Sequence, residues 1–93
     1  MRPELFKVER VEDWPTDSAK TLWIVWGETI EDHPRRMKLR TTDMWKAALL
    51  TELHKSGRMA WVTWMDTFRG DPWLRRCEAD TTKFEPSEVI AHV

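Results

Sequence analysis

The stretch WVTWMDTFRGDPWLRR, residues 61–76, combines flat rings with cations. It holds three tryptophans, one phenylalanine and three arginines within 16 residues. An exposed ring can stack on an unpaired base, which contributes about 1–3 kcal/mol per base, and a neighbouring cation can offset a phosphate. The same rings can fill the core of a small domain, because each large aromatic side chain buries about 150–250 Å². The stretch therefore leaves two interpretations open, a stacking surface and a hydrophobic core.

A second group of cations lies in the segment RRMKLR. Its alternation places Arg36, Lys38 and Arg40 on one face of a strand, and Met37 and Leu39 on the other. Three cations on one face indicate a surface that is wet or that meets an anion. Charged rows of this kind usually pair with carboxylates of a neighbouring strand and remain solvated, so the row is compatible with both a solvated face and phosphate binding.

The sequence contains no catalytic or metal-binding pattern. The histidines, His33, His54 and His92, lie far apart and lack metal-ligand spacing. The one cysteine, Cys77, has no evident base to activate it as a nucleophile and is expected to be a small buried residue. The three glycines form no phosphate-binding loop. We therefore predict a non-enzymatic protein without a cofactor or a metal.

Length and charge predict one domain with a basic middle segment. The chain has 93 residues and a net charge of −1, and we expect a single domain over residues 1–93. Residues 33–58 carry seven cations and two carboxylates, whereas residues 1–32 carry four cations and eight carboxylates. A single cysteine, the lack of a signal-like leader and the lack of an apolar run of about 18 residues predict a cytoplasmic protein that does not enter a membrane.

The hydrophobic pattern predicts five strands and one helix. The strands are expected at Leu5–Trp14, Thr21–Ile30, Arg35–Arg40, Arg58–Thr67 and Pro72–Asp80, and the helix at Thr41–Gly57. Gly27 is a candidate for a bulge or a bend within its strand. We expect residues 81–93 to form a short acidic tail outside a core that covers about residues 5–80.

The predicted helix, TTDMWKAALLTELHKSG, has recognisable ends. Thr41 or Thr42 can cap its N-terminus, and Gly57 suits the left-handed residue that follows its C-terminus. Trp45 begins a row of apolar residues spaced four apart. We expect this row, and Trp45 with it, to pack on the core.

The order of the elements, three strands, one helix and a hairpin, is that of the OB-fold. The segment LRTTDMWKAALLTELHKSGRMAWVTWMDTFRGDPWLRRCEA resembles the second half of such a barrel, and the resemblance covers about residues 5–80. It rests on element order and pattern. The resemblance implies a mainly β domain, a five-stranded Greek-key barrel with its helix between the third and fourth strands. An open α+β sheet with one packed helix is the alternative.

The resemblance also implies a binding face. OB-fold proteins commonly hold oligonucleotides on strands 2 and 3 and in the loops that join strands 1–2 and 4–5. The corresponding residues of this chain are Trp23 or Trp26, Arg36, Lys38, Arg40, Phe68, Arg69, Trp73 and Arg75. Of the two tryptophans in strand 2, Trp23 is expected to face outward. Trp26 shares the expected core face with Leu22 and Ile24.

Seven tryptophans are many for a core of this size. We expect most of them to be buried and one to three to be partly exposed, and exposed rings are typical of a binding surface. In the strand predicted at 58–67, the pattern does not decide whether the face with Trp61 or the face with Trp64 points inward.

Two functions agree with these features. The first is single-stranded nucleic-acid binding without base specificity, through the basic strand and the nearby rings. The alternative is a protein-interaction module, a subunit or an inhibitor that binds another protein. This alternative is favoured by seven Trp, five Met and nine Arg, because these residue types are enriched at the centres of protein interfaces.

Overall fold

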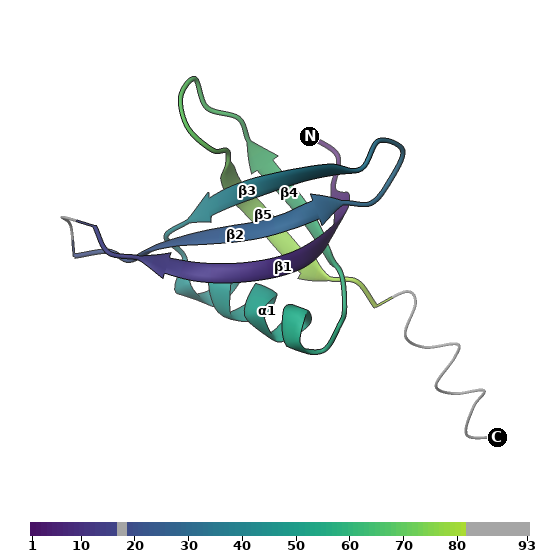
Figure 1. Cartoon of the computed structure of the whole chain (residues 1–93), viewed down its shortest axis with the longest axis horizontal. Helices are drawn as coiled ribbons and strands as arrows, with labels where there is room; N and C mark the ends of the chain where they lie inside the picture. Colours follow the sequence, from purple (N-terminus) through teal and green to yellow (C-terminus); the bar gives the residue numbers. More distant parts are fainter. Residues whose placement is uncertain (17–18, 82–93) are drawn as a thin grey trace.

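The computed structural model describes residues 1–16 and 19–81 of the chain (Figure 1). Those residues form five strands and one helix in the order β-β-β-α-β-β, which confirms the predicted fold class. The elements are β1 (Glu4–Trp14), β2 (Leu22–Thr29), β3 (Arg35–Thr41), α1 (Met44–Lys55), β4 (Ala60–Met65) and β5 (Trp73–Ala79). The acidic tail predicted at residues 81–93 lies outside the described residues, except for Thr81.

The five strands close into a barrel in the order β1-β2-β3-β5-β4, with β4 pairing back onto β1. β3 and β5 run parallel and pair at Arg40 and Trp73, whereas the other neighbouring strands are antiparallel. Closure removes the unpaired edges that an open sheet leaves exposed. The alternative of an open sheet is therefore wrong. Figure 1 shows β1, β2 and β3 across the front, β4 and β5 behind them, and α1 below.

The barrel interior is filled by apolar side chains from the strands and the helix. The completely buried ones are Phe6, Val25, Leu39, Leu50, Ala60 and Val62. β4 turns Ala60, Val62 and Trp64 inward, so Trp61 lies on its outer face. This settles the orientation of β4 that the sequence pattern left open.

α1 packs on the barrel through a different face from the predicted one. Its buried residues are Ala47, Leu50 and Leu53, whereas Trp45 is 79% exposed, so the predicted burial of Trp45 is wrong. The cause is that apolar residues surround the first two turns of the helix, so their spacing does not select one face. Within residues 1–16 and 19–81, no helix combines the length and the apolar character needed to cross a bilayer.

The ends of α1 follow standard capping chemistry. The cap is Asp43 rather than one of the preceding threonines, because its carboxylate accepts hydrogen bonds from the amides of Trp45 and Lys46 at 2.9 and 3.3 Å. At the other end, Gly57 has the predicted left-handed backbone, with φ of +72°. These caps satisfy amide and carbonyl groups that the helix itself leaves unpaired.

Inside the barrel, β1 and β2 approach each other closely where the Phe6 ring covers Gly27. A Cβ atom at residue 27 would lie 2.3 Å from the Phe6 ring and 2.5 Å from the carbonyl oxygen of Lys7. The predicted bulge is not at Gly27 but in β1, where the register shifts between Val8 and Arg10. Gly27 is therefore required by the close contact between two strands.

Gly27→Ala should lower the free energy of unfolding by about 1–3 kcal/mol or more, because the added methyl group overlaps the Phe6 ring. Urea unfolding followed by tryptophan fluorescence measures the loss. In a Phe6→Leu background, part of the cost of Gly27→Ala should disappear, since only the contact with the Lys7 carbonyl remains. An equal cost in both backgrounds would show that the ring does not exclude a side chain at residue 27.

Candidate nucleic-acid interface

The seven tryptophans are mostly not core residues. Only Trp64 is buried, at 5% exposure, whereas Trp14 and Trp45 are 50% and 79% exposed. The other four, Trp23, Trp26, Trp61 and Trp73, are half-buried. The expectation that most of the rings are buried is therefore wrong. A stacking surface has to be sought where a partly exposed ring lies beside cations.

The outer face of β3 carries the predicted row of cations. Arg36, Lys38 and Arg40 lie on this face, as their alternation with buried Leu39 predicts. Their partners on the neighbouring strand β2 are Glu28, Trp26 and Ile24, respectively. The row therefore lies next to one tryptophan of β2.

This outward tryptophan is Trp26 and not the predicted Trp23. Gly27 faces the core beneath Phe6, and fully buried Val25 lies on the same side of β2. Trp26, between them in the sequence, therefore faces outward. Trp23 shares the side of Val25 and lines a hollow with α1 residues Met44, Ala47, Ala48, Thr51 and Glu52. The sequence signal for this orientation was Gly27, because a strand glycine marks a close approach of two chain segments.

A bulge in β1 brings a further cation to Trp26. In the register of β1 with β2, Glu9 is an extra residue, so the alternation of β1 reverses there and Arg10 joins the outer face. The guanidinium carbon of Arg10 lies 4.5 Å from the centre of the Trp26 ring, and the ammonium nitrogen of Lys38 lies 4.6 Å from it. Both distances are within the range of about 6 Å for favourable cation–π contacts. Sequence alternation cannot reveal this bulge, so Arg10 was not predicted.

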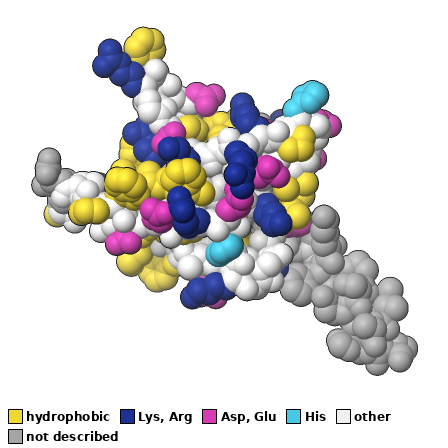
Figure 2. Space-filling model, viewed as in Figure 1, with side chains coloured by type: hydrophobic (Ala, Val, Ile, Leu, Met, Phe, Trp, Pro, Cys, Tyr) yellow, Lys and Arg dark blue, Asp and Glu magenta, His cyan; other side chains and the backbone are white. Residues whose placement is uncertain are grey.

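Trp26 lines an open hollow of about 680 Å³, here called the β1–β3 hollow. Its lining residues are Glu9, Arg10, Trp26, Gly27, Arg36, Met37, Lys38, Asp71 and Pro72. Figure 2 shows Lys and Arg side chains gathered with hydrophobic ones over this side of the barrel. The hollow thus combines a ring and cations on one surface.

Carboxylates accompany the cations of the β1–β3 hollow. The ion pairs are Arg36–Glu9, Lys38–Asp71 and Arg10–Glu12, at 2.5, 4.0 and 2.6 Å. All six side chains are at least 36% exposed, and such pairs contribute only about 0–1 kcal/mol each. In the free protein this face is therefore solvated, and its cations are paired with carboxylates. This is one of the two alternatives that the sequence left open for the row of cations. A phosphate can replace a carboxylate there at a small cost.

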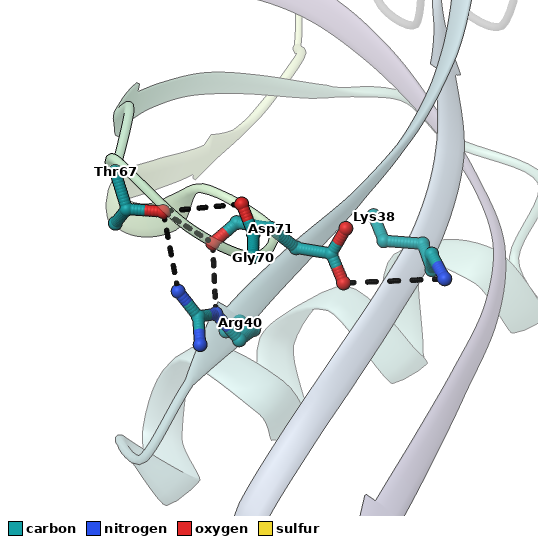
Figure 3. Close-up of polar contacts among 5 residues, drawn as sticks. All are labelled: Lys38, Arg40, Thr67, Gly70 and Asp71. Carbon is teal, nitrogen blue, oxygen red and sulfur yellow. Dashed lines mark hydrogen bonds and ion pairs between the residues drawn. The ribbon is translucent and has the colours of Figure 1, made fainter.

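Arg40 differs from the other cations of β3 because it holds the β4–β5 loop, residues 66–72. Its Nε donates a hydrogen bond to the carbonyl oxygen of Asp71 at 2.8 Å, and its Nη2 lies 3.5 Å from the Thr67 hydroxyl (Figure 3). Its guanidinium carbon lies 4.3 Å from the centre of the Trp73 ring. Arg40 and Trp73 therefore position the loop beside the β1–β3 hollow.

Phe68 and Arg69 belong to the β4–β5 loop, and this loop projects from the barrel (Figure 1). Phe68 is 97% exposed, and Arg69 is also exposed. Neither residue lines the β1–β3 hollow, although Asp71 of the same loop does. The two predicted residues are thus an exposed ring and an exposed cation in a loop whose Asp71 lines the hollow.

Arg75 lies apart from this face. Relative to β4, β5 has one extra residue between Leu74 and Arg76, so Arg75 is part of a second bulge. Arg75 and Arg76 are both exposed and line a different hollow with Trp61, here called the β4–β5 hollow. The structure therefore separates Arg75, like Trp23, from Arg36 and Lys38.

The histidines and the cysteine are distributed as isolated residues. Among the described residues, no group of three or more His, Cys, Asp or Glu side chains is arranged to hold a metal ion. Burial raises the pKa of the Cys77 thiol to about 11, so the thiol stays protonated near neutral pH. The Nδ1 atom of His54 lies 2.9 Å from the carbonyl oxygen of Val8, which ties α1 to β1 beside the bulge. His33 is exposed, and His92 lies outside the described residues.

No protein-family model, curated protein or solved structure matches this chain. The candidate interface therefore depends on geometry alone. That geometry is one outward ring beside two cations, in a hollow next to a loop with a second exposed ring.

Arg40→Ala should loosen the β4–β5 loop. It removes the hydrogen bond to Asp71 and the contact with Trp73, which together contribute about 1–2 kcal/mol. We expect a lower free energy of unfolding and faster tryptic cleavage after Arg69, measured by urea titration and mass spectrometry. Arg36→Ala removes the same charge from the same strand face but only an exposed ion pair, so its cost should be less than about 0.5 kcal/mol. Equal effects of the two substitutions would contradict the role of Arg40.

Proposed function

We propose that this protein is a non-enzymatic binder of single-stranded nucleic acid that uses the outer face of β1, β2 and β3. The observation that carries the proposal is the Trp26 ring beside Arg10 and Lys38 in an open hollow. A single strand needs a flat surface for its unpaired bases and positive charge for its phosphates. The β1–β3 hollow offers both on one surface.

The strand order supports an assignment to OB-like barrels. The order β1-β2-β3-β5-β4, with α1 between β3 and β4, is compatible with that fold. OB-folds bind oligonucleotides on their second and third strands, with the 1–2 and 4–5 loops at the sides. The proposed face corresponds to this position, since Trp26 and Lys38 come from β2 and β3.

Binding exchanges the protein's own carboxylates for phosphates. Glu9, Glu12 and Asp71 hold the cations of the free protein, and phosphate oxygens take their places. A base then stacks on the Trp26 indole as a cation moves toward the strand. Because each phosphate competes with a carboxylate, we expect weak to moderate affinity. Because every base has a π-face, we expect little base preference.

A titration with short oligothymidine at low salt, followed by intrinsic tryptophan fluorescence, tests the proposal. We expect saturable quenching that salt reverses, with a log–log slope of about −0.7 per phosphate contacted. Trp26→Ala should weaken binding by about 5- to 150-fold, which corresponds to about 1–3 kcal/mol for one stacked base.

Trp45→Ala is the matched control, because it removes an exposed ring from α1 that does not line the β1–β3 hollow. Its affinity should equal that of the original protein. A flat titration of the original protein would rule out the proposed function. An affinity of Trp26→Ala equal to that of the original protein would exclude the β1–β3 hollow as the site.

A protein partner is the second candidate, and a separate surface favours it. Met44 and Trp45 are 58% and 79% exposed at the start of α1, and Trp and Met are enriched at interface centres. The contact expected there is apolar, so it should depend little on salt.

Affinity purification at high salt tests this second candidate. The protein and its Trp26→Ala variant should retain the same partner from a cell extract, whereas Trp45→Ala should lose it. A partner that Trp45→Ala retains would exclude α1 as the docking surface.

A further inference from the structure

The β4–β5 hollow is a second place where arginines surround a ring. It has a volume of about 560 Å³ and lies on the outer face of β4 and β5. Among its lining residues are Arg2, Trp61, Arg75, Arg76 and Glu78. The lining side chains include three arginines and one carboxylate, so their charges sum to +2.

These arginines differ from the cations of the β1–β3 hollow because no side chain among the described residues pairs with them. In the part of the chain that the structure describes, the side chains of Arg2, Arg75 and Arg76 form no ion pair or hydrogen bond. Glu78 lines the hollow without pairing to them. An arriving phosphate has no carboxylate to displace there, and arginine offers the fork of donors that phosphate oxygens accept.

Two features of the strands build this surface. The bulge in β5 exposes Arg75 and Arg76 in succession, although strict alternation would direct one of them inward. The Trp61 indole donates a hydrogen bond from Nε1 to Oδ1 of buried Asp80 at 3.2 Å. This bond restrains the ring at the hollow before any ligand arrives.

The two hollows lie on strands that are neighbours in the barrel, because β5 pairs with β3 and β4 pairs with β1. The outward residues follow the strand order as Arg10 of β1, Trp26 of β2, Lys38 and Arg40 of β3, Trp73, Arg75 and Arg76 of β5, and Trp61 of β4. Cations and indoles alternate along this band, and the contact of Arg40 with Trp73 joins its two halves. A chain of alternating phosphates and bases matches that alternation.

We propose that the β4–β5 hollow binds backbone phosphates of the same single strand that occupies the β1–β3 hollow. This inference rests on the proposed function, and it adds the path of the bound nucleic acid and the length of its binding site. The bound nucleic acid crosses β3 and β5 around the barrel, so the full site is longer than one face. Site sizes of about 4–16 nucleotides are known for barrels of this type.

Oligothymidines of 4 and 12 nucleotides without terminal phosphates, lengths chosen from that range of about 4–16 nucleotides, separate the two hollows. The 4-mer should occupy only the β1–β3 hollow. The 12-mer should reach both hollows, so it should bind more tightly and with a steeper dependence of affinity on salt. Arg75→Ala combined with Arg76→Ala should weaken binding of the 12-mer by about tenfold or more. It should also reduce the slope by about 1.4, the value for two lost phosphate contacts on a single strand. Affinity for the 4-mer should not change.

Lys7→Ala combined with Lys55→Ala is the matched control, because it removes the same charge from exposed residues that line neither hollow. This control should bind the 12-mer like the original protein. A charge-conserving variant, Arg75→Lys with Arg76→Lys, should bind the 12-mer more tightly than the double alanine variant, because it keeps the positive charge and loses only the fork of donors. Equal 12-mer affinity for the double alanine variant and the original protein would overturn the inference and leave the proposed function intact. Failure of the original protein to bind either oligothymidine would overturn both the inference and the proposed function.

Discussion

The outer surface of the barrel depends on one contact inside it, the packing of the Phe6 ring over Gly27. This contact leaves no room for a side chain at residue 27 and fixes which side of β2 faces the core. Val25 points inward as a consequence, and Trp26 points outward. A slip of one residue in this strand would turn Trp26 into the core and remove the ring from the surface. The position of the candidate site is therefore decided by core packing.

Two bulges then supply cations that regular strands would have turned inward. At Glu9 the alternation of β1 reverses, which brings Arg10 to Trp26. At Arg75 the alternation of β5 reverses in the same way, which leaves two successive arginines in solvent. Bulges also increase the twist of a strand, which a small closed barrel requires. The same irregularities thus serve closure of the barrel and the charge of its surface.

The sequence predicts the fold better than it predicts the site, for a physical reason. β3 alternates between charged and apolar residues, so both its orientation and its row of Arg36, Lys38 and Arg40 follow from period two. β2 and the first turns of α1 are apolar on all sides, so periodicity assigned Trp23 and Trp45 to the wrong faces. The contact of Trp26 with Arg10 of β1 depends on register, and the ion pair of Lys38 with Asp71 depends on the path of the β4–β5 loop. Contacts between residues distant in sequence determine both.

The rings on the surface fall into two kinds, and the difference separates the two candidate functions. Cations lie over Trp26 and Trp73, so these indoles are partly covered. Within the described residues, no cation lies over Trp45, which is also the most exposed indole. A bare ring suits an apolar partner, because no charge has to be moved before contact. The rings of the barrel face and of α1 therefore differ in what an approaching group meets first, a cation at Trp26 and Trp73 and a bare indole at Trp45.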